Sequence, residues 1–152
     1  MSAFELAVIP GVRLREAPVL LLLHFHNALR EELADLRRTA AEALDSRIYG
    51  PDLIQELRRR FEFLKLVNKY HSVAEDEVIF RALDVHVKNV VSAYSLEHTS
   101  TEDILDSIFH YLDVLEKEDE KRLSKPFQEL VYFICTLQSS ICKHMAKEEE
   151  QV

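Results

Sequence analysis

Residues 57–75 read LRRRFEFLKLVNKYHSVAE, and the spacing of their apolar side chains decides the fold. From Leu57 to Leu64 the inward apolar residues recur at intervals of four and three, which is the spacing of one face of an α-helix. The same face continues to His71 and Glu75, so polar side chains follow apolar ones along a single stripe. A stripe of this kind packs against equivalent stripes on neighbouring helices in a helical bundle.

Three other segments carry a stripe with the same period, and few prolines or glycines interrupt them. We predict helices at residues 18–44, 52–83, 94–115 and 124–152, with a connector at residues 84–93 and a charged turn at residues 116–122. Long helices joined by short connections favour antiparallel neighbours. The sequence therefore predicts an all-α fold, an up-down-up-down four-helix bundle.

Composition argues against several other classes of protein. Only two of the 152 residues are glycine, whereas β-hairpins and phosphate-binding loops depend on glycine. A net charge of −8 argues against nucleic acids and anionic membranes as partners, and the apolar run at residues 17–23 is too short to span a membrane. Cys135 and Cys142 would lie about 10 Å apart on one helix, too far for a disulfide bond. Free cysteines favour a reducing compartment, so we expect the cytoplasm or the nucleus.

Each predicted inward stripe carries one histidine, and two of the stripes also carry a glutamate one turn later. The residues are His26, His71 with Glu75, His98, and His144 with Glu148. Burying an ionised carboxylate without a positive partner costs several kcal/mol. Since imidazole and carboxylate groups are common metal ligands, a metal cluster inside the bundle would supply the positive charge.

The remaining three histidines are not expected to bind metal. His24 and His110 share their helical faces with acidic residues, which is typical of a solvated face, and His86 lies in the connector. The spacing His-x-x-x-Glu occurs three times in the chain, against about one occurrence expected by chance. The spacing indicates a metal site because it coincides with the inward stripes, where residues i and i+4 lie on one helical face.

Other metal-binding motifs are absent from the sequence. It contains neither the His-Glu-x-x-His zinc motif nor a Cys-x-x-Cys pair for structural zinc. It also lacks the Glu-x-x-His pairs that ferritin-like di-iron bundles use. Three hypotheses therefore remain open: a metal-binding module without turnover, an oxygen-binding or oxygen-activating metalloprotein, and a metal-free helical interaction bundle.

The order of these ligand candidates resembles that of hemerythrin-like (HHE) domains. Those domains carry His on the first helix, His-x-x-x-Glu on the second, His on the third and His-x-x-x-Glu on the fourth. The resemblance is closer to one branch, the N-terminal hemerythrin domains of plant BRUTUS-type RING E3 ubiquitin ligases, and it covers about residues 17–152. It is carried by HSVAEDEVIF (71–80), ALDVHVKNV (82–90), YSLEH (94–98) and HMAKEEEQV (144–152).

The resemblance implies a non-haem di-iron site. Zinc is the alternative metal for the same ligands. Glu75 and Glu148 would bridge the two irons, and the terminal ligands would be His26, His71, His98 and His144. Oxygen-carrying members of the family have a fifth histidine one turn after the third-helix histidine, where this chain has Glu102. This difference argues against a dedicated oxygen carrier. It also leaves one coordination position open, for which the candidates are Glu102, water and a small ligand.

The resemblance also implies a function: an iron-sensing or oxygen-sensing regulatory module of an E3 ubiquitin ligase in iron homeostasis. Its partners would be iron, O2, the remainder of the ligase and the protein substrates of the ligase. The ubiquitin-transferring parts are missing from this chain, so the chain itself is not expected to be an enzyme. We expect residues 1–16 to be an N-terminal extension and residues 17–152 to be the metal-binding domain, truncated at its C-terminus.

Overall fold

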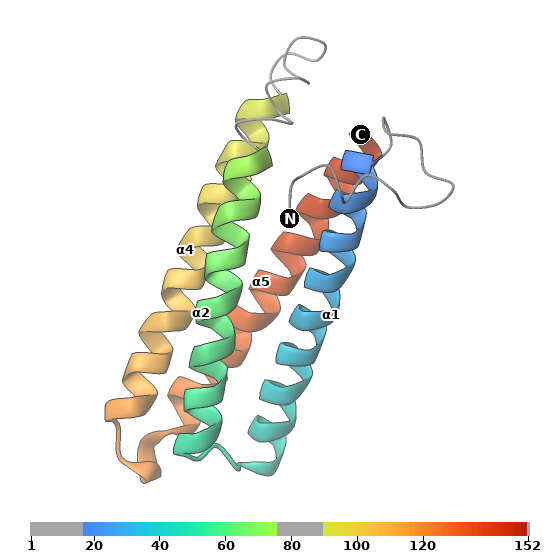
Figure 1. The fold of residues 1–152 in the computed structure, drawn as a ribbon. Helices are drawn as coiled ribbons and strands as arrows, with labels where there is room; N and C mark the ends of the chain where they lie inside the picture. The colour runs from blue at the N-terminus through green and yellow to red at the C-terminus, as the bar shows by residue number, and fades with distance from the viewer. Residues whose placement is uncertain (1–16, 76–89, 152) are drawn as a thin grey trace.

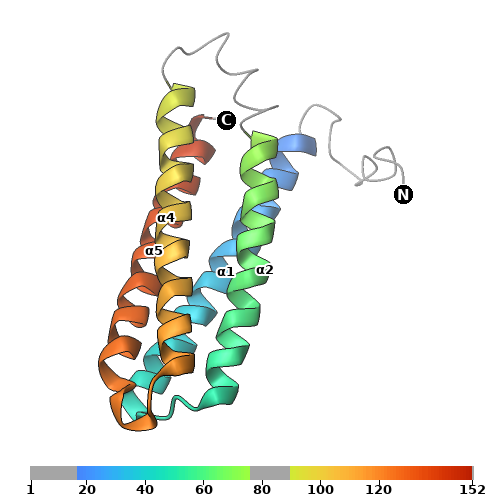
Figure 2. The ribbon, with the colours of Figure 1, turned by 90° about the vertical axis from the view of Figure 1, so that its left-hand side faces the viewer.

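The computed structural model describes residues 17–75 and 90–151. These residues form α1 (Ala17–Ser46), α2 (Pro51–Ala74), α4 (Val90–Lys117), the short 3-10 helix η3 (Glu120–Arg122) and α5 (Ser124–Gln151). The four long helices run alternately down and up (Figures 1 and 2). α5 packs against α1 and α4, and α4 packs against α2. The predicted up-down-up-down four-helix bundle is confirmed.

Within the described residues, the helix bounds agree with the predicted ones to within two residues except at the start of α4, and the predicted end of the second helix at residue 83 is not tested. This helix begins at Val90, whereas the sequence predicted a connector that continued to residue 93. Val90 and Val91 are β-branched, but β-branching lowers helix propensity only slightly, so these residues do not prevent the helix from starting early. The predicted helical residues 76–83 and most of the predicted connector lie outside the described residues.

The α1–α2 connection explains why two long helices can lie antiparallel here. α1 ends where Arg47 adopts a left-handed conformation with φ of 57°, and the amide of Ile48 donates a 3.1 Å hydrogen bond to the carbonyl of Ala43. Pro51 then occupies the first turn of α2, where its missing amide hydrogen is not needed. The chain therefore reverses direction within a few residues at the end of the bundle opposite the histidines (Figure 1).

The predicted inward stripes form the core of the bundle. Their buried apolar members are Leu22, Leu29, Leu33, Leu36 and Ala40 on α1; Leu57, Phe61 and Leu64 on α2; Leu105, Ile108, Leu112 and Leu115 on α4; and Leu130, Ile134, Leu137 and Ile141 on α5. Cys135 and Cys142 are both free thiols, as the sequence predicted. Burial of this apolar surface is the main stabilising contribution to such a bundle.

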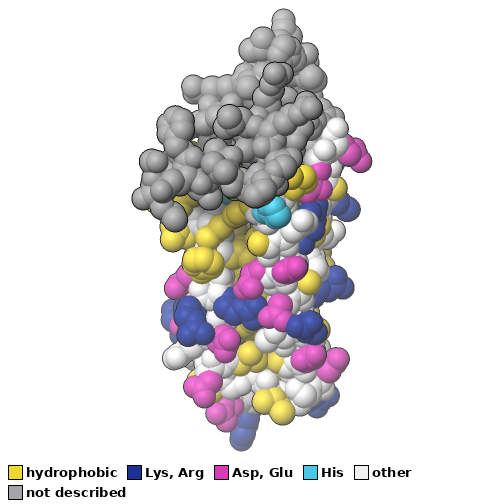
Figure 3. Space-filling model, turned by 45° about the vertical axis from the view of Figure 1, so that its right-hand side comes forward, with side chains coloured by type: hydrophobic (Ala, Val, Ile, Leu, Met, Phe, Trp, Pro, Cys, Tyr) yellow, Lys and Arg dark blue, Asp and Glu magenta, His cyan; other side chains and the backbone are white. Residues whose placement is uncertain are grey.

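On one face of the described part, charged and apolar side chains occupy different levels of the bundle (Figure 3). Figure 3 shows acidic and basic side chains interspersed on the lower part of the bundle and an apolar area above them. A shallow apolar groove of about 110 Å³ lies between α1 and α2, and its lining includes Phe25, Phe63 and Val67. Within the described ranges, no helix is both long and apolar enough to cross a membrane.

Candidate metal centre

Four helices carry their histidines to the same end of the bundle. His26 and His98 lie near the beginnings of α1 and α4, whereas His71 and His144 lie near the ends of α2 and α5. Because successive helices are antiparallel, the beginnings of two helices meet the ends of the other two (Figure 1). Sequence positions 118 residues apart thus come together in one layer, and every histidine in this layer is buried or half-buried.

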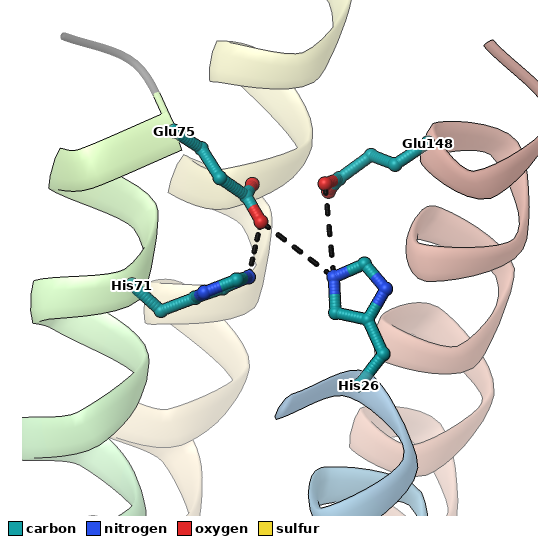
Figure 4. Close-up of side chains that lie close together, drawn as sticks. All are labelled: His26, His71, Glu75 and Glu148. Atoms are coloured by element: carbon teal, nitrogen blue, oxygen red, sulfur yellow. Dashed lines mark ion pairs between the residues drawn. The ribbon is translucent and has the colours of Figure 1, made fainter. Parts of the chain in front are cut away.

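Two glutamates complete this layer from opposite sides. Glu75 follows His71 by one turn and caps the C-terminal end of α2, and Glu148 follows His144 by one turn on α5. Both side chains are only 1% exposed. Figure 4 shows the two carboxylates and the imidazole of His26 converging on the space between α1, α2 and α5. The inward direction that the stripes predicted is therefore observed for both carboxylates.

The six side chains form two overlapping groups that share both glutamates. One group adds His26 and His71, and the other adds His98 and His144. In each group, one donor atom from every residue lies within 4.8 Å of the others. Donor atoms on one metal ion with bonds of about 2.1 Å lie roughly 3–4 Å apart, so each group is close to the size of a first coordination sphere.

Each glutamate presents one oxygen to each histidine pair. Oε1 of Glu75 lies 3.6 Å from Nε2 of His26 and contacts Nε2 of His71. Oε2 of the same carboxylate lies 3.2 Å from Nε2 of His98 and 4.0 Å from Nε2 of His144. A carboxylate with its two oxygens directed to two different sets of nitrogens has the arrangement of a bridging ligand.

Glu148 divides its oxygens between the pairs in the same way. Its Oε2 lies 3.8 Å from Nε2 of His26, whereas its Oε1 contacts Nε2 of His144 and lies 4.0 Å from Nε2 of His98. In the second pair the Nε2 atoms of His98 and His144 lie 2.8 Å apart. All four imidazoles therefore direct Nε2, the nitrogen remote from the backbone, toward the two carboxylates.

The centre of this layer brings together the buried oxygens of two carboxylates. Among the described residues, Oε2 of Glu148 and Nε2 of His26 are buried and make no hydrogen bond, and the other three carboxylate oxygens of Glu75 and Glu148 are buried against imidazole nitrogens. A buried polar group without a partner costs about 1–3 kcal/mol. A cation between the carboxylates would provide partners for all of these atoms, so the donor set fits a metal ion.

The two carboxyl groups have opposite pKa shifts. Burial raises the pKa of Glu148, and the charge of Glu75 raises it further against the opposing hydrogen bond of His144, with a net rise. Burial also opposes ionisation of Glu75, but His26, His71 and His98 outweigh burial and hold the pKa of Glu75 well below its usual range. Without metal, the layer thus favours one ionised carboxylate over two, and a bound cation would favour both.

Two further carboxylates contact the rear nitrogen, Nδ1, of a candidate ligand; this is the ring nitrogen opposite the one that faces the shared carboxylates. The sequence did not identify either carboxylate. Glu149 lies 3.1 Å from Nδ1 of His26, and Glu97 contacts Nδ1 of His144. The hydrogen bond from Arg30 is the main cause that holds the pKa of Glu149 below its usual range. Burial would raise the pKa of Glu97, but Lys147 and His144 outweigh burial, and the net shift is downward.

The structure also locates the residues that were considered as less favoured ligands. Glu102 is exposed and belongs to neither His/Glu group, so the fold does not bring it to the centre of the layer. His24 and His110 are exposed, in agreement with the sequence prediction. His86 lies outside the described residues.

Comparison with known proteins agrees with this geometry. The family model described as "Hemerythrin HHE cation binding domain" matches residues 17–152. Two Arabidopsis thaliana proteins named zinc finger protein BRUTUS-like are 53% and 52% identical to the chain, and zinc finger protein BRUTUS from the same plant is 41% identical. These similarities cover 100%, 99% and 90% of this chain, but only 12%, 12% and 10% of the respective relatives. No solved structure matches the chain.

Proposed function

This chain belongs to the hemerythrin HHE cation-binding family, and we propose that it binds two iron ions at the buried His/Glu layer. Glu75 and Glu148 are the proposed bridging ligands. The proposed terminal ligands are His26 and His71 for one ion, and His98 and His144 for the other. The observation that carries this assignment is the division of oxygens, since each glutamate directs one oxygen to each histidine pair.

The donor set supports a transition metal but is compatible with more than one. Imidazole and carboxylate ligands suit iron and zinc alike. Two imidazoles and two carboxylate oxygens give each ion four protein donors, which completes a tetrahedral zinc site and leaves coordination positions open on a six-coordinate iron. When bound, a pair of irons would supply reversible binding of a small ligand or a change of oxidation state, and zinc would supply neither.

We further propose that the domain senses iron or oxygen for a larger protein, as a regulatory module of an E3 ubiquitin ligase in iron homeostasis. The proposal is supported by similarity to BRUTUS-like zinc finger proteins, of which the chain spans 12%. Because ligands come from all four long helices, binding of the ions would hold their ends together, and loss of the ions would release them. A change at this end of the bundle is what the rest of such a protein would detect.

Anaerobic titration with Fe(II), followed by metal quantification, tests the binding proposal. We expect the wild-type chain to saturate at about two ions, because two-metal sites place their ions only about 3.5–4 Å apart and share ligands. The double variant Glu75→Ala/Glu148→Ala should lose most of this binding. The matched control is Glu62→Ala/Glu150→Ala, which removes the same number of charges from exposed positions on the same two helices. Saturation at one ion, or unchanged binding by the double ligand variant, would refute the bridging assignment.

A parallel zinc titration and an oxygen exposure separate the proposed function from its alternatives. A sensor should bind iron but should not oxidise an added small molecule when oxygen is admitted. An oxygen-activating enzyme would oxidise such a molecule over many turnovers. A chain that binds neither iron nor zinc would instead be a metal-free interaction bundle.

A further inference from the structure

Two of the proposed ligands have a carboxylate behind them. The rear nitrogen Nδ1 of His26 lies 3.1 Å from Oε1 of Glu149, and the rear nitrogen of His144 contacts Oε2 of Glu97. In both imidazoles the opposite nitrogen, Nε2, faces the shared carboxylates. One histidine of each proposed metal position is therefore held between an outer carboxylate and the centre of the layer.

Each outer carboxylate is itself held by a cation. Arg30 forms two parallel hydrogen bonds of 2.8 Å to the two oxygens of Glu149, and Lys147 forms one of 2.7 Å to Oε1 of Glu97. The guanidinium fork fixes the plane of a carboxylate as well as its position, whereas an ammonium group acts as a point charge. Glu149 is consequently the more firmly oriented of the two outer carboxylates.

These contacts suit the imidazole tautomer that metal binding requires. An ionised carboxylate only accepts hydrogen bonds, so the nitrogen that contacts it must donate, and a neutral imidazole has only one N–H. When a metal ion takes the lone pair of Nε2, the proton of the neutral ring lies on Nδ1, where the outer carboxylate accepts it. The same contacts restrict rotation of the rings.

We propose that Glu149 and Glu97 are positioning residues of the metal centre, which orient His26 and His144 and present Nε2 of each ring to its ion. This inference rests on the proposed metal binding and extends it to residues outside the ligand set. His71 is positioned differently, because its ring stacks on Phe25 with centroids 4.0 Å apart and planes inclined by 20°. The two outer carboxylates therefore serve different ions, Glu149 the one held by His26 and Glu97 the one held by His144.

A purely structural role for these ion pairs makes a different prediction. Exposed ion pairs contribute about 0–1 kcal/mol to stability, and such a contribution would be lost with or without metal. A positioning role instead changes metal affinity and the coordination geometry of one ion. Removal of a hydrogen-bond partner behind a metal-binding histidine typically weakens binding by about 10–100-fold.

Cobalt(II) is a suitable probe because its visible absorption reports the geometry of each bound ion, and competition with a chelator gives its affinity. We expect Glu149→Ala and Glu97→Ala each to weaken one of the two binding steps by about 10–100-fold and to alter part of the visible spectrum. Glu149→Gln should recover part of the loss, because the amide oxygen can still accept the Nδ1 hydrogen. Glu149→Ala should have the larger effect of the two alanine variants, because Arg30 orients this carboxylate more firmly.

Matched controls remove one negative charge from an exposed position on the same helix. Glu150→Ala is the control for Glu149, and Asp103→Ala is the control for Glu97. Both controls should bind cobalt as the wild type does, and thermal unfolding of all metal-free variants shows whether each one folds. Wild-type affinities and spectra for both alanine variants would overturn the positioning role. Failure of the wild-type chain to bind two ions would instead contradict the proposed function itself.

Discussion

Replacement of Glu148 with leucine should stabilise the metal-free protein while it removes the stabilisation that metal provides. In the absence of metal, the buried Glu148 carboxylate faces Glu75; its Oε1 contacts the imidazole of His144, whereas its Oε2 makes no hydrogen bond among the described residues. A buried polar group without a partner costs about 1–3 kcal/mol, so its replacement by an apolar side chain should raise the free energy of unfolding by a similar amount. In this variant the imidazole of His144 still has a carboxylate partner, Glu97.

The pH dependence of this gain follows from the raised pKa of Glu148. A carboxyl group whose pKa is higher in the folded state than in the unfolded state destabilises the fold when it is ionised. The cost is absent below the unfolded pKa, where the group is protonated in both states, and it grows as pH rises toward the folded pKa. The stability advantage of Glu148→Leu should therefore be present at neutral pH and shrink below about pH 4.5.

Urea unfolding in the presence of a chelator, and again with excess metal, measures both effects. The control is Glu150→Leu, an exposed position on the same helix, where we expect a change within about 0.5 kcal/mol. The reasoning would be refuted if Glu148→Leu destabilised the metal-free protein at neutral pH. It would also be refuted if the variant gained as much stability from metal as the wild type does.

Three further predictions follow from the core and from the proposed ligands. Leu33→Ala should lower the free energy of unfolding by about 2–5 kcal/mol without changing metal stoichiometry, because Leu33 is fully buried in the apolar part of the core; urea unfolding and metal quantification check this. Removal of metal with a chelator should lower the melting temperature by roughly 10–20 °C relative to protein with free metal at a hundredfold excess over the Kd of each ion, and equal midpoints would contradict a structural role for the ions. Acidification should release the ions as protons compete for the imidazoles, near the ordinary histidine pKa of about 6.5 or below, which loss of the cobalt(II) absorption would report; full retention at pH 4 would contradict histidine ligation.

The fold could be predicted because the spacing of the apolar residues identifies both the helices and the face that each helix buries. Intervals of three and four residues place Leu57, Phe61 and Leu64 on one face, and the structure buries that face. The start of α4 was predicted four residues too late, since β-branched Val90 and Val91 were assigned to the connector. Local propensity is a weak signal there, because the differences between residues are small compared with the stabilisation of a long helix.

The inner layer could be predicted from the sequence, but the outer carboxylates could not. His71 with Glu75, and His144 with Glu148, are one turn apart, so spacing alone places them on one face. Glu149 and Glu97 contact histidines 123 and 47 residues away in sequence, and no local pattern encodes such contacts. The only available signal was their position directly beside Glu148 and His98.

The helical period explains why Glu102 was considered and why it lies outside the layer. A residue four positions after His98 is rotated by about 40° from it, and a residue three positions after it by about 60° in the opposite direction. The inward face of α4 follows the second direction, since Thr101 and Leu105 are buried. Glu102 consequently lies on the other side of the stripe and is exposed.

The central claim is that Glu75 and Glu148 hold two ions side by side between two pairs of histidines. X-ray absorption at the iron edge, on protein loaded with Fe(II) under anaerobic conditions, tests it most directly because it measures the distance between neighbouring metal ions. The account predicts a shell of nitrogen and oxygen donors together with iron–iron scattering at about 3.5–4 Å. A donor shell without any iron–iron scattering, in protein that carries a full load of iron, would contradict it.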